Sequence, residues 1–195
     1  MAKLIILNKP FQVLSQFTDN VGRPTLADYI KTKGVYPAGR LDYDSEGMIL
    51  LTDNGHLQSE ISHPRNKLNK TYWVQVEGIC KETHCRALLE GVELKDGSAR
   101  AIDCETINPL EIWPRTPPIR VRKTVPDSWI KITINEGRNR QIRRMTAAVG
   151  LPTLRLIRFA IGEMTISDLK PGEFKLHQAN SYKSLVKNLL TKENN

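Results

Sequence analysis

The sequence predicts an α+β protein with a mixed, largely antiparallel central sheet flanked by short helices and loops. Strand-like segments, such as residues 3–8 and 129–134, are interspersed with short helical patterns in no regular strand-helix-strand order, which favours this class. Of the 195 residues, 39% are apolar, enough for a core, and 26% are charged, as in ordinary folded proteins. The chain is therefore expected to fold rather than to be disordered.

The amino-terminal part predicts two buried strands and two short helices. Residues 3–8 form an apolar run of strand length, and residues 48–52 form a second one, closed by an Asp-Asn-Gly turn. A helix is expected to open at residues 23–25, because apolar side chains then recur at helical spacing up to Ile30. A brief helix around residues 57–61 follows and stops at a proline.

The rest of the chain predicts further strands and helices around a long loop. Residues 71–76 alternate as a strand, with Tyr72, Val74 and Val76 on one face. Five prolines fall between Pro109 and Pro126, so this stretch is expected to form a loop. The remaining predicted elements are helices over 81–90 and 140–149, each ended by a glycine, strands over 129–134 and 154–159, and an amphipathic helix with a polar tail over 181–195.

The positive charge is concentrated in one stretch of the sequence. The formal net charge is +8, yet residues 115–158 hold eleven basic and two acidic residues, a local charge of +9. Nine of the eleven are arginines, whose planar guanidinium suits phosphate oxygens and stacks on bases. A solvated basic face is the alternative, but the confinement and the arginine bias favour a nucleic acid as the partner.

Several classes of protein are disfavoured. The longest apolar runs are far shorter than the ~20 residues of a membrane-spanning helix, and the first residues show no signal-peptide pattern. The three cysteines form no CxxC pair, which argues against a disulfide framework or a zinc ribbon. We therefore expect a cytoplasmic protein with no membrane partner.

Four groups of residues could carry chemistry. Residues 42–47 imitate the start of a calcium loop, but the approach contains Pro37 and Gly39, so a turn or cap role for Asp42 is the default from spacing alone. Tyr72, on its alternating strand, is more often a core residue than a catalytic one. The third group is Cys80, His84 and Cys85, read as structural. The fourth is Arg140, Arg143 and Arg144, which share a helix face and can clamp a phosphate or carboxylate, with no Asp or Glu between Gly137 and Leu151 to pair with them.

Three segments match the pattern of a known family. They are residues 39–47 (Gly-Arg-Leu-Asp-Tyr-Asp-Ser-Glu-Gly), residues 70–72 (Lys-Thr-Tyr) and residues 137–145 (Gly-Arg-Asn-Arg-Gln-Ile-Arg-Arg-Met). Residues 8–10 (Asn-Lys-Pro) and an L-x-R-x-x-I-G stretch over 156–162 also fit, in the same order. Together they resemble the motifs of ribosomal pseudouridine synthases, of the branch like the small-subunit synthase A, over nearly the whole chain.

The resemblance implies an enzyme that isomerises a uridine to pseudouridine in 23S ribosomal RNA, without a cofactor or metal. By position, Asp42 would be the catalytic carboxylate, Tyr72 would stack on the base, and Arg143 would be the ion-pair partner of Asp42. Leu156 would form an apolar wall, and Arg40 would fill the space that the flipped nucleotide leaves. The fold implied is that of pseudouridine synthases, with a central catalytic cleft.

The expected partner is 23S ribosomal RNA or an assembling large ribosomal subunit, bound by a monomer. The basic side chains expected to contact this RNA are Arg140, Arg144, Arg120, Arg122 and Lys123. Many relatives carry an amino-terminal S4-like RNA-binding domain, which this chain is expected to lack, leaving one catalytic domain over residues 1–180 and a helical tail over 181–195. A non-catalytic RNA-binding or ribosome-assembly protein is the alternative. It shares the basic stretch but gives no reason for the three motifs to coexist.

Overall fold

A computed structural model describes residues 1–109, 112–119 and 124–190, including all the predicted strands and helices except the end of the tail. The chain divides into two compact units. The first unit comprises Met1–Leu68 and Arg158–Asn195, and the second comprises Asn69–Ile157. Strand β9, Thr153–Ile161, contributes residues to both units.

The first unit is built on antiparallel strands. Its strand order is β11-β1-β3, and the buried pattern of β1 and β3 reflects their unbroken apolar sequences. Ile5 and Leu7 of β1 pack with Leu26 and Ile30 in an apolar cluster. The strands of this unit besides β9 are β1 (Ala2–Lys9), β2 (Tyr36–Pro37), β3 (Glu46–Thr52), β10 (Met164–Thr165) and β11 (Phe174–Ala179).

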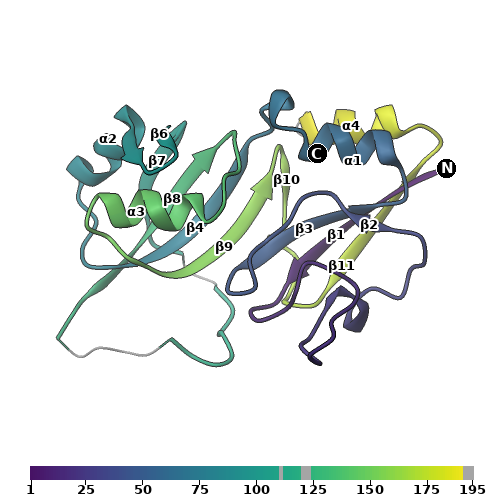
Figure 1. Cartoon of the computed structure of the whole chain (residues 1–195), viewed down its shortest axis with the longest axis horizontal. Coiled ribbons are helices and arrows are strands. Elements are labelled where there is room, and N and C mark those ends of the chain that lie inside the picture. The colour runs from purple at the N-terminus through teal and green to yellow at the C-terminus, as the bar shows by residue number, and fades with distance from the viewer. Residues whose placement is uncertain (110–111, 120–123, 191–195) are drawn as a thin grey trace. The chain divides into compact units, whose positions relative to one another are not determined.

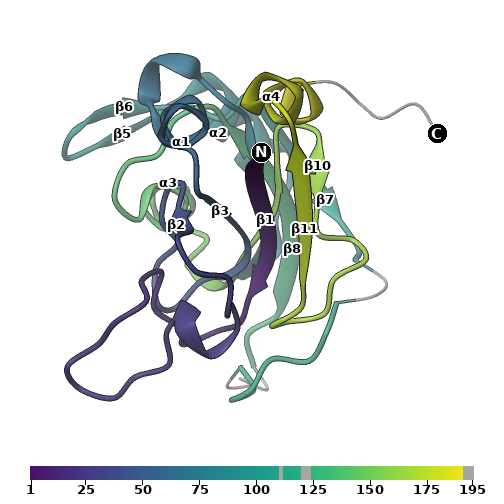
Figure 2. The ribbon, with the colours of Figure 1, turned by 90° about the vertical axis from the view of Figure 1, so that its right-hand side faces the viewer.

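Short helices complete the first unit. Helices α1, Gly55–Ser62, and α4, Tyr182–Leu190, lie side by side (Figures 1 and 2), with the rings of His56 and Tyr182 stacked at 5.5 Å between centroids. Two 3-10 turns, η1 (Leu26–Asp28) and η2 (Pro64–Asn66), make up the rest.

The second unit packs two helices against antiparallel strands. Strands β4, β8 and β7 are adjacent in that order, and Figure 1 shows α2 and α3 on the same side of β4 and β8. The elements besides β9 are β4 (Lys70–Glu77), α2 (Glu82–Glu90), β5 (Val92–Leu94), β6 (Gly97–Ala99), β7 (Asp103–Ile107), β8 (Asp127–Ile134) and α3 (Gln141–Ala148).

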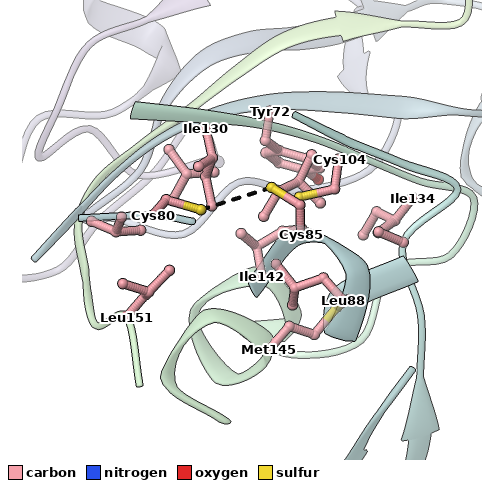
Figure 3. Close-up of a cluster of buried hydrophobic side chains, with 14 of the residues drawn as sticks. Tyr72, Cys80, Cys85, Leu88, Cys104, Ile130, Ile134, Ile142, Met145 and Leu151 are labelled. Atoms are coloured by element: carbon pink, nitrogen blue, oxygen red, sulfur yellow. Dashed lines mark hydrogen bonds between the residues drawn. The ribbon is translucent and has the colours of Figure 1, made fainter. Parts of the chain in front are cut away.

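The core of the second unit joins one face of β4 to the two helices. Tyr72, Val74 and Val76 are buried, while the residues between them are half-buried, so the predicted alternation is confirmed. Figure 3 shows Tyr72 in the same cluster as Ile142 and Met145 of α3. The cluster also contains the three buried, free cysteines, with the Cys80 and Cys85 sulfurs 3.7 Å apart. Burial raises the pKa of Cys80 to about 12, as expected of a structural thiol.

The structure confirms the predicted class and corrects several elements. The helix expected near residues 23–30 is only the turn η1, which begins at the Thr25–Asp28 capping box and ends at the cap residue Tyr29. Strands β2, β5, β6, β7, β10 and β11 were not predicted. They are short or partly exposed edge strands, in which the apolar pattern is weak. The described residues of the loop 108–126 form neither helix nor strand, as predicted.

Candidate active site

The loop that carries Asp42 connects β2 to β3 and is held on both sides of Asp42. The Ser15 hydroxyl accepts the Leu41 N–H at 3.0 Å and donates to the Leu41 carbonyl at 2.7 Å. The Gln12 N–H donates to the carbonyl of Tyr43 at 2.9 Å. Because both neighbours of Asp42 are fixed to the same preceding segment, the half-buried carboxylate has a defined place on a loop without regular structure.

Arg158 ties the two ends of this loop together. It is only 4% exposed, and its Nε donates to the Met48 carbonyl at 2.8 Å. Its Nη1 donates to the carbonyl of Arg40 at 3.3 Å. Main-chain carbonyls from before and after Asp42 thus share one buried guanidinium, which restrains the loop from the side of β9.

Gly47 allows the close approach of β3 to β9 at this point. Its φ is +104°, and a Cβ placed on it would lie 2.4 Å from the carbonyl oxygen of Arg158. No other residue type fits that contact without moving the backbone. The last glycine of the 39–47 motif is therefore required by packing.

Lys9 is a buried amine beside the same loop. Its side chain is fully buried at the end of β1, and Nζ donates to the carbonyls of Pro10 and Val13, both at 2.9 Å. Desolvation by burial lowers the pKa of Lys9 to about 7, although the negative charges of Glu46, Asp44 and Asp42 oppose that shift. Lys9 therefore contributes to the electrostatic environment of the acidic loop.

The second unit contains a buried apolar cluster and a basic helix. Tyr72 on β4 is 7% exposed, and Leu156 on β9 is 5% exposed in the same cluster. On α3, Ile142 and Met145 face the core, whereas Arg143, between them in sequence, is half-buried. The helix therefore anchors itself through apolar side chains and presents arginines on its other positions.

The start of α3 is braced by a network of polar side chains. Arg138 donates to both carboxylate oxygens of Glu136, at 3.2 Å each, and to main-chain carbonyls of the β5–β6 hairpin. Gln141 donates to Glu136 at 2.5 Å and accepts the Arg138 N–H at 2.9 Å. Arg144 forms a two-point ion pair with Asp96, at 2.6 and 3.0 Å. Asp96 thus supplies Arg144 with an acidic partner from outside the segment between Gly137 and Leu151, which contains no Asp or Glu.

The predicted site residues fall in both units. Asp42 and Arg40 belong to the first unit, with Arg40 exposed. The second unit brings Tyr72 and Leu156 into one apolar cluster and places three arginines at the start of one helix. The second-unit residues are Tyr72, Arg143, Leu156, Arg140 and Arg144, while Arg120, Arg122 and Lys123 lie outside the described residues. The catalytic and binding roles assigned to all these residues stay predictions.

Sequence reasoning missed the supporting roles of Lys9, Arg158 and Asp96. A lysine at the end of an apolar strand is a signal that could have drawn attention to Lys9, and Arg158 lies in the matched 156–162 stretch without a role. Asp96 has no such signal, because its pairing with Arg144 depends on tertiary structure.

Metal ligation and membrane insertion find no support in the described residues. Across residues 1–109, 112–119 and 124–190, no three histidine, cysteine, aspartate or glutamate side chains are grouped as metal ligands would be. In the same part of the chain, no helix has the length and apolar character needed to cross a bilayer.

Comparison with known proteins identifies the family. The sequence model of the RNA pseudouridylate synthase family matches residues 3–148, which include Asp42, Tyr72 and Arg143. The chain belongs to the RNA pseudouridylate synthase family. It is therefore an enzyme, an RNA pseudouridine synthase, and the resemblance seen in its motifs is confirmed.

Similar proteins support the same conclusion. This pseudouridine synthase is 56% identical over 173 residues to ribosomal large subunit pseudouridine synthase E of Vibrio vulnificus (strain CMCP6), covering 89% of this chain and 74% of the relative. It is 55% identical over 171 residues to the protein of that name in Xanthomonas axonopodis pv. citri (strain 306), covering 86% and 90%. A crystal structure of a pseudouridylate synthase aligns with a TM-score of 0.75 at 27% identity, covering 97% of this chain and 74% of that one, which confirms the pseudouridine synthase fold.

Proposed function

We propose that this pseudouridine synthase isomerises a specific uridine of 23S ribosomal RNA. The support is the identity of 52–56% to four proteins named ribosomal large subunit pseudouridine synthase E. The protein acts on free RNA or on an assembling large subunit, as a cytoplasmic monomer. The RNA is attracted by the positive charge of the stretch 115–158, which contains eleven basic and two acidic residues.

Asp42 is the proposed catalytic carboxylate, and the restraint of its loop is the observation that carries this assignment. Main-chain bonds at Leu41 and Tyr43, with Arg158 at the loop ends, hold a carboxylate ready for a sugar or base that is brought to it. The reaction breaks the C–N bond between uracil and ribose. A carboxylate can attack a carbon centre or stabilise positive charge at C1′.

Arg143 is the proposed partner of Asp42. Burial of a carboxylate against a base disfavours its charged form, and a guanidinium offsets that effect by favouring the ionised acid. Arg143 lies on a helix that is fixed to the core of its unit by Ile142 and Met145. Its side chain is half-buried, so it is accessible without being fully solvated.

Tyr72 and Leu156 are the proposed walls of the uracil site. After the glycosidic bond breaks, the base must rotate so that C5 faces the sugar, and it must not escape. A flat ring and an aliphatic side chain hold a base by stacking and shape without fixing its rotation. The proton on C5 is then removed once the C–C bond has formed, and the Tyr72 hydroxyl is one candidate to relay it.

Base flipping and RNA binding complete the proposal. Taking a base out of the stack costs a few kcal/mol, and phosphate contacts with arginines offset that cost. Arg40, exposed at the edge of the Asp42 loop, is proposed to fill the space that the nucleotide leaves. Neither a cofactor nor a metal is required by this scheme, because each chemical step uses a side chain. The proposed phosphate contacts are Arg140, Arg144, Arg120, Arg122 and Lys123.

The test is a map of pseudouridine in ribosomal RNA from cells with and without this protein. We expect one uridine of 23S RNA to lose its modification in cells without the protein and to regain it on complementation. Complementation with Asp42→Asn should not restore it. If every pseudouridine of 23S RNA survives the deletion, the 23S assignment is wrong, and restoration by Asp42→Asn would favour a non-catalytic role in ribosome assembly.

A further inference from the structure

The β5–β6 hairpin contacts the basic start of α3 through its turn. Asp96 occupies that turn, and its two carboxylate oxygens accept hydrogen bonds from Nη1 and Nη2 of Arg144 at 2.6 and 3.0 Å. Arg138 donates to the carbonyls of Gly97 at 3.0 Å and of Ser98 at 2.5 Å, in the same hairpin. Two arginines of the 137–145 motif are therefore engaged by one short element of the same unit.

The charges of this pair reinforce each other. The hydrogen bonds from Arg144 hold the pKa of Asp96 below its usual value, and those to Asp96 raise the pKa of Arg144. Planar, two-point pairing of a guanidinium with a carboxylate restricts the orientation of both groups more than a single contact does. Both side chains of such a pair lose rotational freedom, and the backbone segments that carry them are restrained relative to each other.

Helix α3 has a particular need for this contact. Its first turn contains no acidic residue, and its cap residue, Arg140, has a φ of +48° and makes no side-chain capping bond. Arginines at 138, 140, 143 and 144 concentrate positive charge at the end of a helix where the dipole is already positive. Because that arrangement is unfavourable, carboxylates supplied from outside the helix, at Asp96 and Glu136, stabilise its first turn.

We propose that Asp96 is a positioning residue for catalysis, which fixes the first turn of α3 through Arg144 and thereby orients Arg143. This inference rests on the proposed function, in which Arg143 is the ion-pair partner of Asp42. It divides the motif arginines into two groups. Arg138 and Arg144 brace the helix against the hairpin, which moves Arg144 from the proposed phosphate contacts to a supporting role. Arg140 and Arg143 serve the reaction and the RNA.

The test compares Asp96→Asn with Glu93→Gln. Glu93 lies on the same hairpin, is exposed, and loses the same charge in its variant. Single-turnover rates are measured by release of tritium from 23S transcript labelled at C5 of uridine, and RNA affinity is measured by filter binding at one salt concentration. We expect Asp96→Asn to lower the rate about tenfold with less than a twofold change in affinity, because a displaced catalytic group slows the reaction and not the binding. Glu93→Gln should match the wild type, and Asp96→Glu should recover part of the rate.

A double-mutant cycle separates bracing from RNA contact. If Arg144 acts through Asp96, then Arg144→Gln and Asp96→Asn should lower the rate equally, and the double variant should be no slower than either. Three results would each overturn the proposal. The first is a double variant whose loss of rate equals the sum of the two single losses in free energy, and the second is an unchanged rate in Asp96→Asn. The third is an RNA affinity that rises in Asp96→Asn and falls in Arg144→Gln. Asp96→Glu serves as the test variant if Asp96→Asn does not fold, and it must then show a reduced rate at unchanged affinity. A wild-type enzyme that releases no tritium would instead contradict the proposed function itself.

Discussion

Replacement of Gly47 by alanine tests whether the Asp42 loop is fixed by the close contact of β3 with Arg158. At Gly47, a Cβ would meet the Arg158 carbonyl oxygen at 2.4 Å, its nitrogen at 2.7 Å and its carbonyl carbon at 2.9 Å. All three are backbone atoms, so the side chain of Arg158 cannot relieve the clash by rotating. The matched control is Gly39→Ala at the other end of the loop, where φ is +92° and a Cβ would have no neighbour within 4 Å.

The two variants share the conformational strain but not the steric clash. A positive φ in a residue other than glycine costs about 1–3 kcal/mol, so Gly39→Ala should destabilise by that amount. In Gly47→Ala the strands must also separate, which breaks the bond from Arg158 to the Met48 carbonyl, worth about 1.5–3 kcal/mol for a charged donor. The expected total for Gly47→Ala is about 2.5–6 kcal/mol, at least about 1.5 kcal/mol more than for Gly39→Ala.

Thermal melting followed by circular dichroism measures the difference. For a chain of this size, 1 kcal/mol corresponds to a shift in Tm of about 2–4 °C, so Gly47→Ala should melt at least about 3 °C below Gly39→Ala. The rate of pseudouridine formation by Gly47→Ala should fall as well, because the loop that carries Asp42 is displaced. Equal melting temperatures for the two variants would refute the argument that the contact with Arg158 restrains this loop.

Three further predictions address Lys9, Tyr72 and metal dependence. The folded-state pKa of Lys9, about 7, lies below the unfolded value of 10.5. Between these values the unfolded chain binds more protons than the folded one, so the free energy of unfolding should rise as pH increases from 7 towards 10. Lys9→Met should lack this part of the rise in Tm, and identical pH profiles would contradict the lowered pKa of Lys9. Tyr72→Phe should fold and bind RNA, yet its single-turnover rate should fall by about 10²–10⁴ if the hydroxyl relays the C5 proton; a lower Tm at a normal rate would return Tyr72 to a purely structural role. EDTA should leave activity on pre-folded RNA intact, and a loss restored by one particular metal would contradict the metal-free scheme.

The fold was predictable where the sequence pattern was strong. The apolar runs of β1 and β3 and the alternation of β4 identify buried strands, and glycines mark the ends of α2 and α3. The edge strands were not predictable, because β11 exposes Phe174 and Leu176 and has no consistent apolar face. Their strand geometry depends on hydrogen bonds to a neighbour, which local sequence does not show.

The candidate site was predictable from motifs, but its support was not. The three motifs locate Asp42, Tyr72 and Arg143, since each stands at a defined place in a recognisable pattern. The residues that hold them act across long separations in sequence: Arg158 reaches Met48, and Asp96 reaches Arg144. Charge alone also misled for Arg155, one of the eleven basic residues of the 115–158 stretch.

Arg155 shows why a basic residue need not contact RNA. It is 6% exposed, and its guanidinium lies 5.7 and 5.9 Å from the ring centroids of Trp113 and Trp129. That arrangement is a cation–π contact within the second unit. Net charge counts Arg155 with the RNA-binding groups, whereas its burial against Trp113 and Trp129 makes it part of the interior of the second unit.

Release of tritium from RNA labelled at C5 of uridine tests the central claim most directly. Pseudouridine has its C5 bonded to the sugar, so each turnover must replace the C5 hydrogen, and the label passes to water. The purified protein should release tritium from 23S transcript up to one equivalent per modified uridine, and Asp42→Asn should release none while it binds the RNA with nearly wild-type affinity. Failure of the wild-type protein to release label, or release by Asp42→Asn at the wild-type rate, would contradict the assignment of this chain as a pseudouridine synthase that uses Asp42.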